Sequence, residues 1–143
     1  MPYWRLFYHV VWATSGRESM IEADAARVIE RSMRTKSRDL GGIVHAVGWM
    51  PDHVHVAVSI PPNIAIGPFV GQMKGASSHA VNQAGAREAA FAWQKEYGVE
   101  SFGERNLPDV VAYLHNQPER HATQTTWDRL ERTTDRDQLP PDP

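Results

Sequence analysis

Apolar and β-branched side chains predict three strands in the first sixty residues. Residues 3–13 are rich in aromatic and β-branched side chains, and residues 43–50 form a second stretch of this kind. Residues 53–60 place valines at alternate positions, which is the period of a half-buried strand. A Met-Pro-Asp turn at 50–52 separates the last two stretches, so we expect them to pair as an antiparallel hairpin.

Helices are predicted between and after these strands. Residues 21–40 carry apolar side chains at helical spacing and end at two glycines, and residues 64–83 form a second helical stretch. Residues 91–102 favour one or two short strands. A third helix is expected from Asn106 to about Gln117, because Asn106 can cap its first turn and a proline follows where no N–H is needed.

The order β-α-β-β-α-β predicts an α+β fold of the ferredoxin-like (split β-α-β) type. This fold has an antiparallel sheet with two helices on one face, and here a C-terminal tyrosine-bearing helix would follow it. We expect the other face of the sheet to be open. Residues 1–122 form one predicted domain, and the polar, proline-rich residues 123–143 are expected to be a disordered tail.

The composition excludes several kinds of chemistry. A chain of 143 residues suits one domain, and the absence of cysteine rules out disulfides, thiolate metal sites and cysteine nucleophiles. No stretch approaches the roughly 20 apolar residues of a membrane span, so we expect a soluble, cytoplasmic protein without a membrane partner.

Basic side chains gather in the first part of the chain, although the net charge is −2. Residues 1–87 carry nine basic and six acidic side chains, whereas residues 88–143 carry six basic and eleven acidic ones. Four arginines of the first predicted helix are spaced by four, three and four, which aligns them on one face. Such a stripe is a candidate track for phosphates, and an ordinary solvated face has the same pattern. The candidate nucleic-acid contacts are Arg5, Arg27, Arg31, Arg34, Arg38 and Lys74.

Two histidines stand two residues apart inside the third predicted strand. Side chains at i and i+2 of a strand share a face, so His53 and His55 point the same way while the valines point to the other side. Two imidazoles at this spacing can bind one metal ion, and they can equally be structural. Strand alternation places Asp52 on the opposite side from both histidines, where it is at most an indirect partner.

Tyr113 and Gln117 are four residues apart in the third predicted helix and therefore share a face. A tyrosine hydroxyl can be a nucleophile and an amide oxygen can be a metal ligand, although each side chain alone is consistent with ordinary packing. A free phenol has a pKa of about 10, so a nearby cation would be needed to favour phenolate. Pro118 lacks an N–H, so we expect the helix to kink or end there, which leaves His121 or His115 as alternative ligands.

Five segments in this order resemble the single-tyrosine HUH transposases of small bacterial insertion sequences and their relatives associated with repetitive extragenic palindromes. The resemblance spans roughly residues 5 to 122. The segments are YHVVWAT at 8–14, MPDHVHV at 50–56, MKGASS at 73–78, WQKEYG at 93–98 and YLHNQ at 113–117.

The resemblance implies a role for each candidate residue. His53 and His55 would be metal ligands, Gln117 the third ligand and Tyr113 the nucleophile, with Mg²⁺ or Mn²⁺ as the metal. Imidazoles also suit zinc, nickel or copper, so the residues themselves leave the metal open. The resemblance further implies cleavage and rejoining of single-stranded DNA through a 5′-phosphotyrosine, recognition of imperfect hairpins, and a homodimer whose tyrosine helices act in cis or in trans.

Two other functions remain open at this point. The first is a non-catalytic nucleic-acid-binding module on the same sheet, with a relict metal site. The second is a zinc hydrolase that uses the His-x-His strand, although such sites usually need further histidines or carboxylates at defined spacing.

Overall fold

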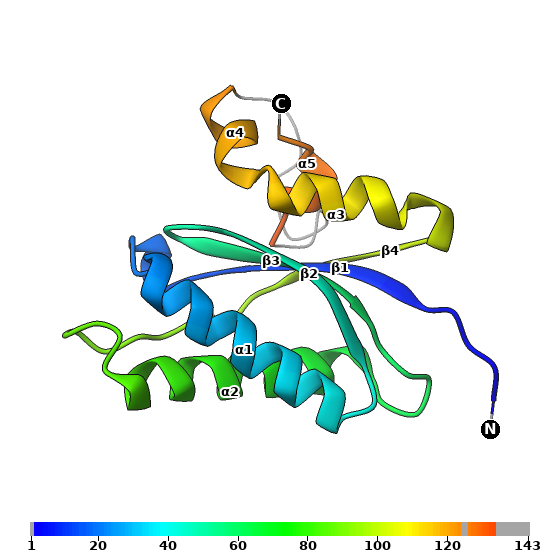
Figure 1. The fold of residues 1–143 in the computed structure, drawn as a ribbon, viewed down its shortest axis with the longest axis horizontal. Coiled ribbons are helices and arrows are strands. Elements are labelled where there is room, and N and C mark those ends of the chain that lie inside the picture. The colour runs from blue at the N-terminus through cyan, green and yellow to red at the C-terminus, as the bar shows by residue number, and fades with distance from the viewer. Residues whose placement is uncertain (1, 124–125, 134–143) are drawn as a thin grey trace, which may run out of the picture.

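The protein folds around a four-stranded antiparallel sheet in the order β2-β3-β1-β4. The computed structural model describes residues 2–123 and 126–133. The strands are β1 (Phe7–Ala13), β2 (Ile43–Met50), β3 (His53–Ser59) and β4 (Gly98–Phe102). Because β3 lies between β2 and β1 and is antiparallel to both, the connections give the predicted ferredoxin-like α+β fold (Figure 1).

Two long helices cover the first face of the sheet. These are α1 (Ala23–Asp39) and α2 (Ile66–Ala84), which lie side by side beneath the strands in Figure 1. The core on this face contains Val54, Val56 and Val58 of β3, packed with Phe69 and Met73 of α2. The valines, which the strand period places on the side opposite His53 and His55, therefore pack against the helices.

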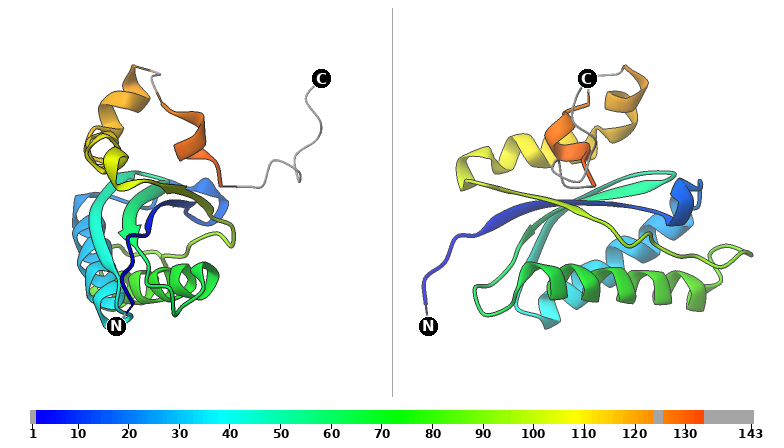
Figure 2. Two further views of the ribbon diagram at one scale, coloured as in Figure 1. Left: turned by 90° about the vertical axis from the view of Figure 1, so that its right-hand side faces the viewer. Right: turned by 180° about the vertical axis from the view of Figure 1, so that it is seen from behind.

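The second face is covered as well, so the expectation of an open face was wrong. It carries α3 (Leu107–His115), α4 (Gln117–Ala122) and the short α5 (Asp128–Glu131), as Figures 1 and 2 show from three sides. Val110, Tyr113 and Leu114 are buried on one side of α3 at helical spacing, and they pack on Ala46 and Ala57 of the sheet. An amphipathic helix of this kind has to bury its apolar side, and the sheet face is the surface it buries.

Helix α3 ends where the proline requires it. The predicted helix 106–117 is divided at Asn116, whose φ of −103° and ψ of 19° are not helical, and α4 begins at Gln117 with Pro118 in its first turn. The missing N–H of Pro118 thus falls at a helix start, where no hydrogen bond is lost. The expected kink is confirmed.

Other boundaries differ from the expected ones. The first strand begins at Phe7, and the stretch 91–102 contains β4 and one isolated bridge between Thr14 and Trp93. Two single-turn 3₁₀ helices lie at Ser15–Arg17 and Glu104–Asn106. In the expected tail, residues 126–133 are described and include α5, while residues 124–125 and 134–143 lie outside the described residues.

None of the helices in residues 2–123 and 126–133 combines the length and the apolar composition that a membrane span needs.

Gly48 lets α3 lie directly against β2. It pairs with His55 across the β2–β3 ladder, and a Cβ atom built on it would stand 2.2 Å from the carbonyl oxygen of Leu114. That distance is far below any real contact of a Cβ atom, and the atom it meets belongs to the backbone. A side chain at this position would therefore push the end of α3 away from the sheet.

We predict that Gly48→Ala lowers the free energy of unfolding by about 1–3 kcal/mol, the usual cost of overpacking. Gly71→Ala is the matched control, because a Cβ atom at Gly71 of α2 meets nothing within 4 Å. That control should gain up to about 1 kcal/mol from helix propensity. Urea unfolding of the two variants measures the difference, and equal stabilities would contradict the close packing of α3 on β2.

Candidate active site

His53 and His55 lie side by side on the second face of β3, as the strand period predicts. Their ring centroids are 5.0 Å apart, and His55 is fully buried while His53 is 5% exposed. The Nε2 atoms of both rings are buried and make no hydrogen bond within the described residues. Two imidazole nitrogens that converge without a hydrogen-bond partner are well suited to a metal ion.

Asp52 fixes the ring of His53. Its Oδ1 lies 2.7 Å from Nδ1 of His53, so the prediction that Asp52 points away from the histidines was wrong. Asp52 stands in the turn before β3, where strand alternation does not yet hold. Burial would lower the pKa of His53, but the carboxylates of Glu131 and Asp52 outweigh it and raise that pKa.

A third histidine fixes the ring of His55. Nε2 of His9, on β1, lies 2.8 Å from Nδ1 of His55 in the buried interior. Burial lowers the pKa of His55, and it lowers the pKa of His9 well below its usual value. Burial thus favours the neutral form of both rings, and one N–H lies between Nε2 of His9 and Nδ1 of His55.

His121 and Glu131 complete a cluster of metal-ligating groups. Oε1 of Glu131 lies 3.3 Å from the Nε2 atoms of His53, His55 and His121, and all four ligand atoms lie within 4.8 Å of one another. His121 was one of the alternatives to Gln117 as a ligand, whereas Glu131 lies in the expected tail and was not anticipated. Burial alone would raise the pKa of Glu131, but the imidazoles outweigh it and hold that pKa well below its usual range.

Gln117 lies beside this cluster. Its side chain is fully buried, and its Oε1 is 3.0 Å from Nε2 of His121. Its Nε2 is buried without a hydrogen-bond partner among the described residues. The other alternative ligand, His115, is exposed at the end of α3 and lies outside the cluster.

Tyr113 reaches the same cluster from α3. Its hydroxyl donates to Oε2 of Glu131 at 2.5 Å and accepts from the backbone N–H of Trp127 at 2.8 Å. Its ring stands edge-on to His55, with centroids 6.1 Å apart. Burial and the hydrogen bond to Glu131 raise the pKa of this phenol to about 12. The phenol and the imidazoles thus meet within one chain.

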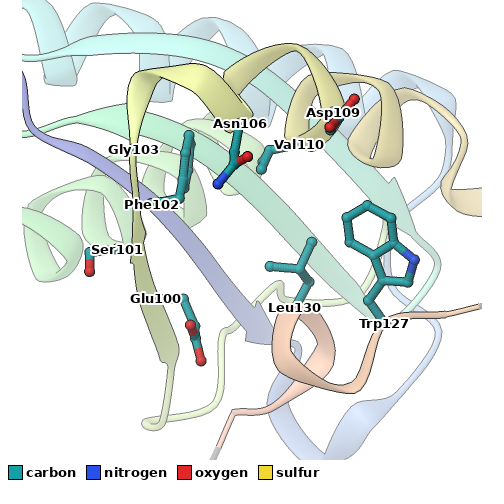
Figure 3. A pocket seen from close by; sticks show the side chains of 9 residues that line it. All are labelled: Glu100, Ser101, Phe102, Gly103, Asn106, Asp109, Val110, Trp127 and Leu130. Carbon is teal, nitrogen blue, oxygen red and sulfur yellow. The ribbon is translucent and has the colours of Figure 1, made fainter.

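Residues 126–133, which we call the cover segment, close the site from outside. Trp127 stacks on Tyr113 with ring centroids 4.6 Å apart, and the guanidinium of Arg120 lies over both rings. Tyr113 has no exposed surface as a result. A pocket of about 730 Å³ lies next to the segment, between β4, the start of α3 and α5 (Figure 3). Trp127 and Leu130 line it, and no histidine of the cluster does.

The cover segment depends on a second close approach at a glycine. A Cβ atom built on Gly98 of β4 would stand 1.6 Å from the carbonyl oxygen of Arg132. No side chain fits at position 98 while the cover segment holds this position.

The basic side chains predicted to contact nucleic acid do not gather at the cluster. The arginines of α1 are exposed, and α1 covers the first face of the sheet (Figure 1). Lys74 donates to the backbone carbonyls of Gln94 and Lys95, at 2.6 and 3.1 Å, so it anchors the loop before β4. Ion pairs join Arg5 to Glu104, Arg27 to Asp24 and Arg34 to Glu30.

Similarity to known proteins extends over most of the chain. Residues 2–117 match the profile of the family described as "Transposase IS200 like". The chain is 26% identical over 122 residues to the ISDra2 transposase TnpA of Deinococcus radiodurans, which covers 82% of this chain and 87% of that protein. It is 25% identical over 121 residues to the transposase for insertion sequence element IS200 of Salmonella typhimurium. This match covers 81% of this chain and 79% of that protein.

Solved structures of transposases also superpose on this chain. A crystallised protein of Deinococcus radiodurans R1, also described as a transposase, superposes with a TM-score of 0.64 and 26% identity over 82% of this chain and 95% of its own. A REP-associated tyrosine transposase bound to a REP hairpin superposes with a TM-score of 0.62 over 85% of this chain and 74% of its own. At 16% identity, the second likeness is one of fold.

We predict that Gly98→Ala displaces the cover segment and leaves the sheet intact. Gly103→Ala is the control, because a Cβ atom at Gly103 meets nothing within 4 Å. In the native structure the backbone amide of Trp127 donates a hydrogen bond to the hydroxyl of Tyr113. Hydrogen exchange of this amide should be at least about tenfold faster than in the wild type in Gly98→Ala, and unchanged in Gly103→Ala. Unchanged exchange in that variant would mean that Arg132 does not hold the segment against β4.

Proposed function

Because the chain belongs to the family of IS200-like transposases, we propose that it cleaves and rejoins single-stranded DNA with Tyr113 as the nucleophile. Membership of this family shows that the protein is a transposase, that is, an enzyme that cleaves DNA. The chemical detail rests on one observation: the hydroxyl of Tyr113 and the Nε2 atoms of His53 and His55 approach the same carboxylate. A nucleophile and a metal site this close can act on one phosphodiester.

The proposed metal is Mg²⁺ or Mn²⁺, held by His53, His55 and Gln117. The two buried imidazole Nε2 atoms fit this role, because they converge on one carboxylate oxygen and make no hydrogen bond of good geometry. The amide oxygen of Gln117 lies beside them, 3.0 Å from Nε2 of His121. A bound divalent ion would polarise the phosphate and stabilise negative charge near the phenol.

The proposed reaction is a transesterification at phosphorus. The oxygen of Tyr113 forms a bond to the phosphorus, and the bond from phosphorus to the 3′ oxygen breaks. The phenol loses one proton and the departing 3′ oxygen gains one, which leaves a 5′-phosphotyrosine and a free 3′-hydroxyl. One phosphodiester replaces another, so rejoining by the reverse step needs no ATP.

DNA can reach Tyr113 only after the cover segment has moved. Glu131 and the N–H of Trp127 hold the tyrosine hydroxyl, and a phenol whose pKa is about 12 is a poor nucleophile. The carboxylate of Glu131 lies between Tyr113 and the imidazoles, where a scissile phosphate would have to lie. We therefore propose that Glu131 leaves when DNA binds.

The proposed substrate is a DNA hairpin with a single-stranded flank, by analogy with the hairpin-bound structural neighbour. Its backbone would contact the predicted basic side chains, of which the arginines of α1 stand exposed. We also propose a homodimer, in which the tyrosine helix could serve either its own histidines, as it lies here, or those of the partner.

The complete burial of Tyr113 favours one alternative, a nucleic-acid-binding module whose metal site is a relict. The two functions differ in whether a covalent bond to DNA ever forms.

We predict that the protein forms a covalent adduct with single-stranded hairpin DNA in the presence of Mn²⁺, which a denaturing gel detects. Tyr113→Phe should abolish the adduct without weakening hairpin binding, because only the hydroxyl is lost. His53→Ala should lower the rate of cleavage in Mn²⁺ by about 100-fold or more. The remaining cleavage should depend less on Mn²⁺. Hairpin binding by the wild type without any adduct would favour the binding module.

We also predict that Glu131→Gln raises the rate of adduct formation by about 10–100-fold. A charge-assisted hydrogen bond contributes about 1.5–3 kcal/mol, and loss of the one between Glu131 and Tyr113 should lower the barrier to attack by about that amount. Glu119→Gln, an exposed carboxylate of α4, should leave the rate unchanged. A slower reaction with weaker Mn²⁺ binding in Glu131→Gln would instead make Glu131 a required metal ligand.

A further inference from the structure

We infer that His9 is a positioning residue that sets the tautomer of His55, so that Nε2 of His55 presents a lone pair to the metal. This inference rests on the proposed function, because it concerns a ligand of the proposed metal. His9 lies on β1, outside the residues expected to bind metal.

The sheet register brings the two rings together. On the β1–β3 ladder, His9 is opposite Ala57 and Val11 is opposite His55, so His9 and His55 are diagonal neighbours on one face. The small side chain of Ala57 leaves room for the imidazole of His9. The ring centroids lie 5.0 Å apart, and Nε2 of His9 is 2.8 Å from Nδ1 of His55.

One proton lies between these two nitrogens, and its placement decides whether His55 can bind metal. Both rings are almost completely buried, which favours neutral imidazoles with one N–H each. If Nδ1 of His55 donates to Nε2 of His9, then Nε2 of His55 keeps its lone pair. If His9 donates instead, the proton of His55 must be on Nε2, and that atom cannot bind a cation.

The second ligand is held by a different kind of acceptor. Asp52 accepts from Nδ1 of His53 at 2.7 Å, so the other nitrogen of that ring, Nε2, points into the metal-ligating cluster. Asp52 is one-third exposed, whereas His9 is 1% exposed. A carboxylate at the position of His9 would be a costly buried charge, and a neutral imidazole supplies the acceptor without it.

Two substitutions separate the acceptor role of His9 from its volume. In His9→Gln, the amide oxygen can take the place of Nε2 and accept from His55. In His9→Leu, a side chain of similar size offers no acceptor. His45→Leu is the control, because His45 is bonded to Ser59 and is not part of the metal-ligating cluster.

The first readout is the tautomer of His55 in the metal-free protein, from two-bond ¹⁵N–¹H NMR correlations. It is measured in a Glu131→Ala background, because the carboxylate of Glu131 lies 3.3 Å from Nε2 of His55 and competes for its proton. In this background we expect the proton on Nδ1 when His9 is intact and in His9→Gln, and a shift toward Nε2 in His9→Leu. The second readout is Mn²⁺ affinity by titration calorimetry. It should fall by about 10–100-fold in His9→Leu, as for other groups that orient a metal ligand, and stay within about threefold in His9→Gln and His45→Leu.

A proton on Nε2 of His55 in Glu131→Ala with His9 intact would overturn the inference, even if no His9 variant folded. Mn²⁺ affinity in His9→Leu equal to that of the wild type would also overturn it. Failure of the proposed function looks different. In that case the wild type forms no DNA adduct, while the tautomer of His55 and its dependence on His9 are still as expected.

Discussion

The packing of α3 against the second face of the sheet is the constraint on which the site depends. Gly48 allows the backbone of α3 to lie against β2, and Tyr113 then fits edge-on to His55 of the neighbouring strand. Small side chains, Ala46 and Ala57, lie beneath the helix and leave space for the aromatic rings. The phenol and the imidazoles meet because helix and sheet approach closely, and the histidine strand alone would not create a site.

Because this site is buried, each of its charged groups needs a partner of opposite charge or a hydrogen-bond partner. Imidazoles, a phenol and a carboxylate removed from water are tolerated only when each charge has partners. The carboxylate of Glu131 faces three imidazoles and accepts from the hydroxyl of Tyr113, so its negative charge is shared among four groups. Asp52 and His9 support the two imidazoles from the opposite side. The polar groups therefore form one connected network in which a change at one member alters the others.

Periodicity predicted the parts of the site that lie within one element, and it failed for contacts between distant elements. The alternation of β3 placed His53 and His55 on one face, and Pro118 correctly predicted the helix break. Glu131 was missed because it follows a polar stretch, in which Trp127 and Leu130 were the only apolar signal of a packed segment. His9 was missed because a diagonal contact depends on strand register, which the composition of a strand does not specify.

The same chemistry that holds the cover segment would also hold a substrate. A carboxylate and a phosphodiester are both oxyanions, and each can place one oxygen near the imidazoles and another near the phenol. Under the proposed function, the cover segment and DNA are alternative occupants of one site, and the protein would bind DNA productively only in its uncovered fraction. The apparent dissociation constant for DNA would then rise in inverse proportion to the uncovered fraction. The contacts of Glu131 and Trp127 with Tyr113 would therefore lower both the reactivity of the phenol and the affinity for DNA. Under that proposal, a sequence change in the cover segment would alter the rate of the enzyme without altering any group that touches the scissile phosphate.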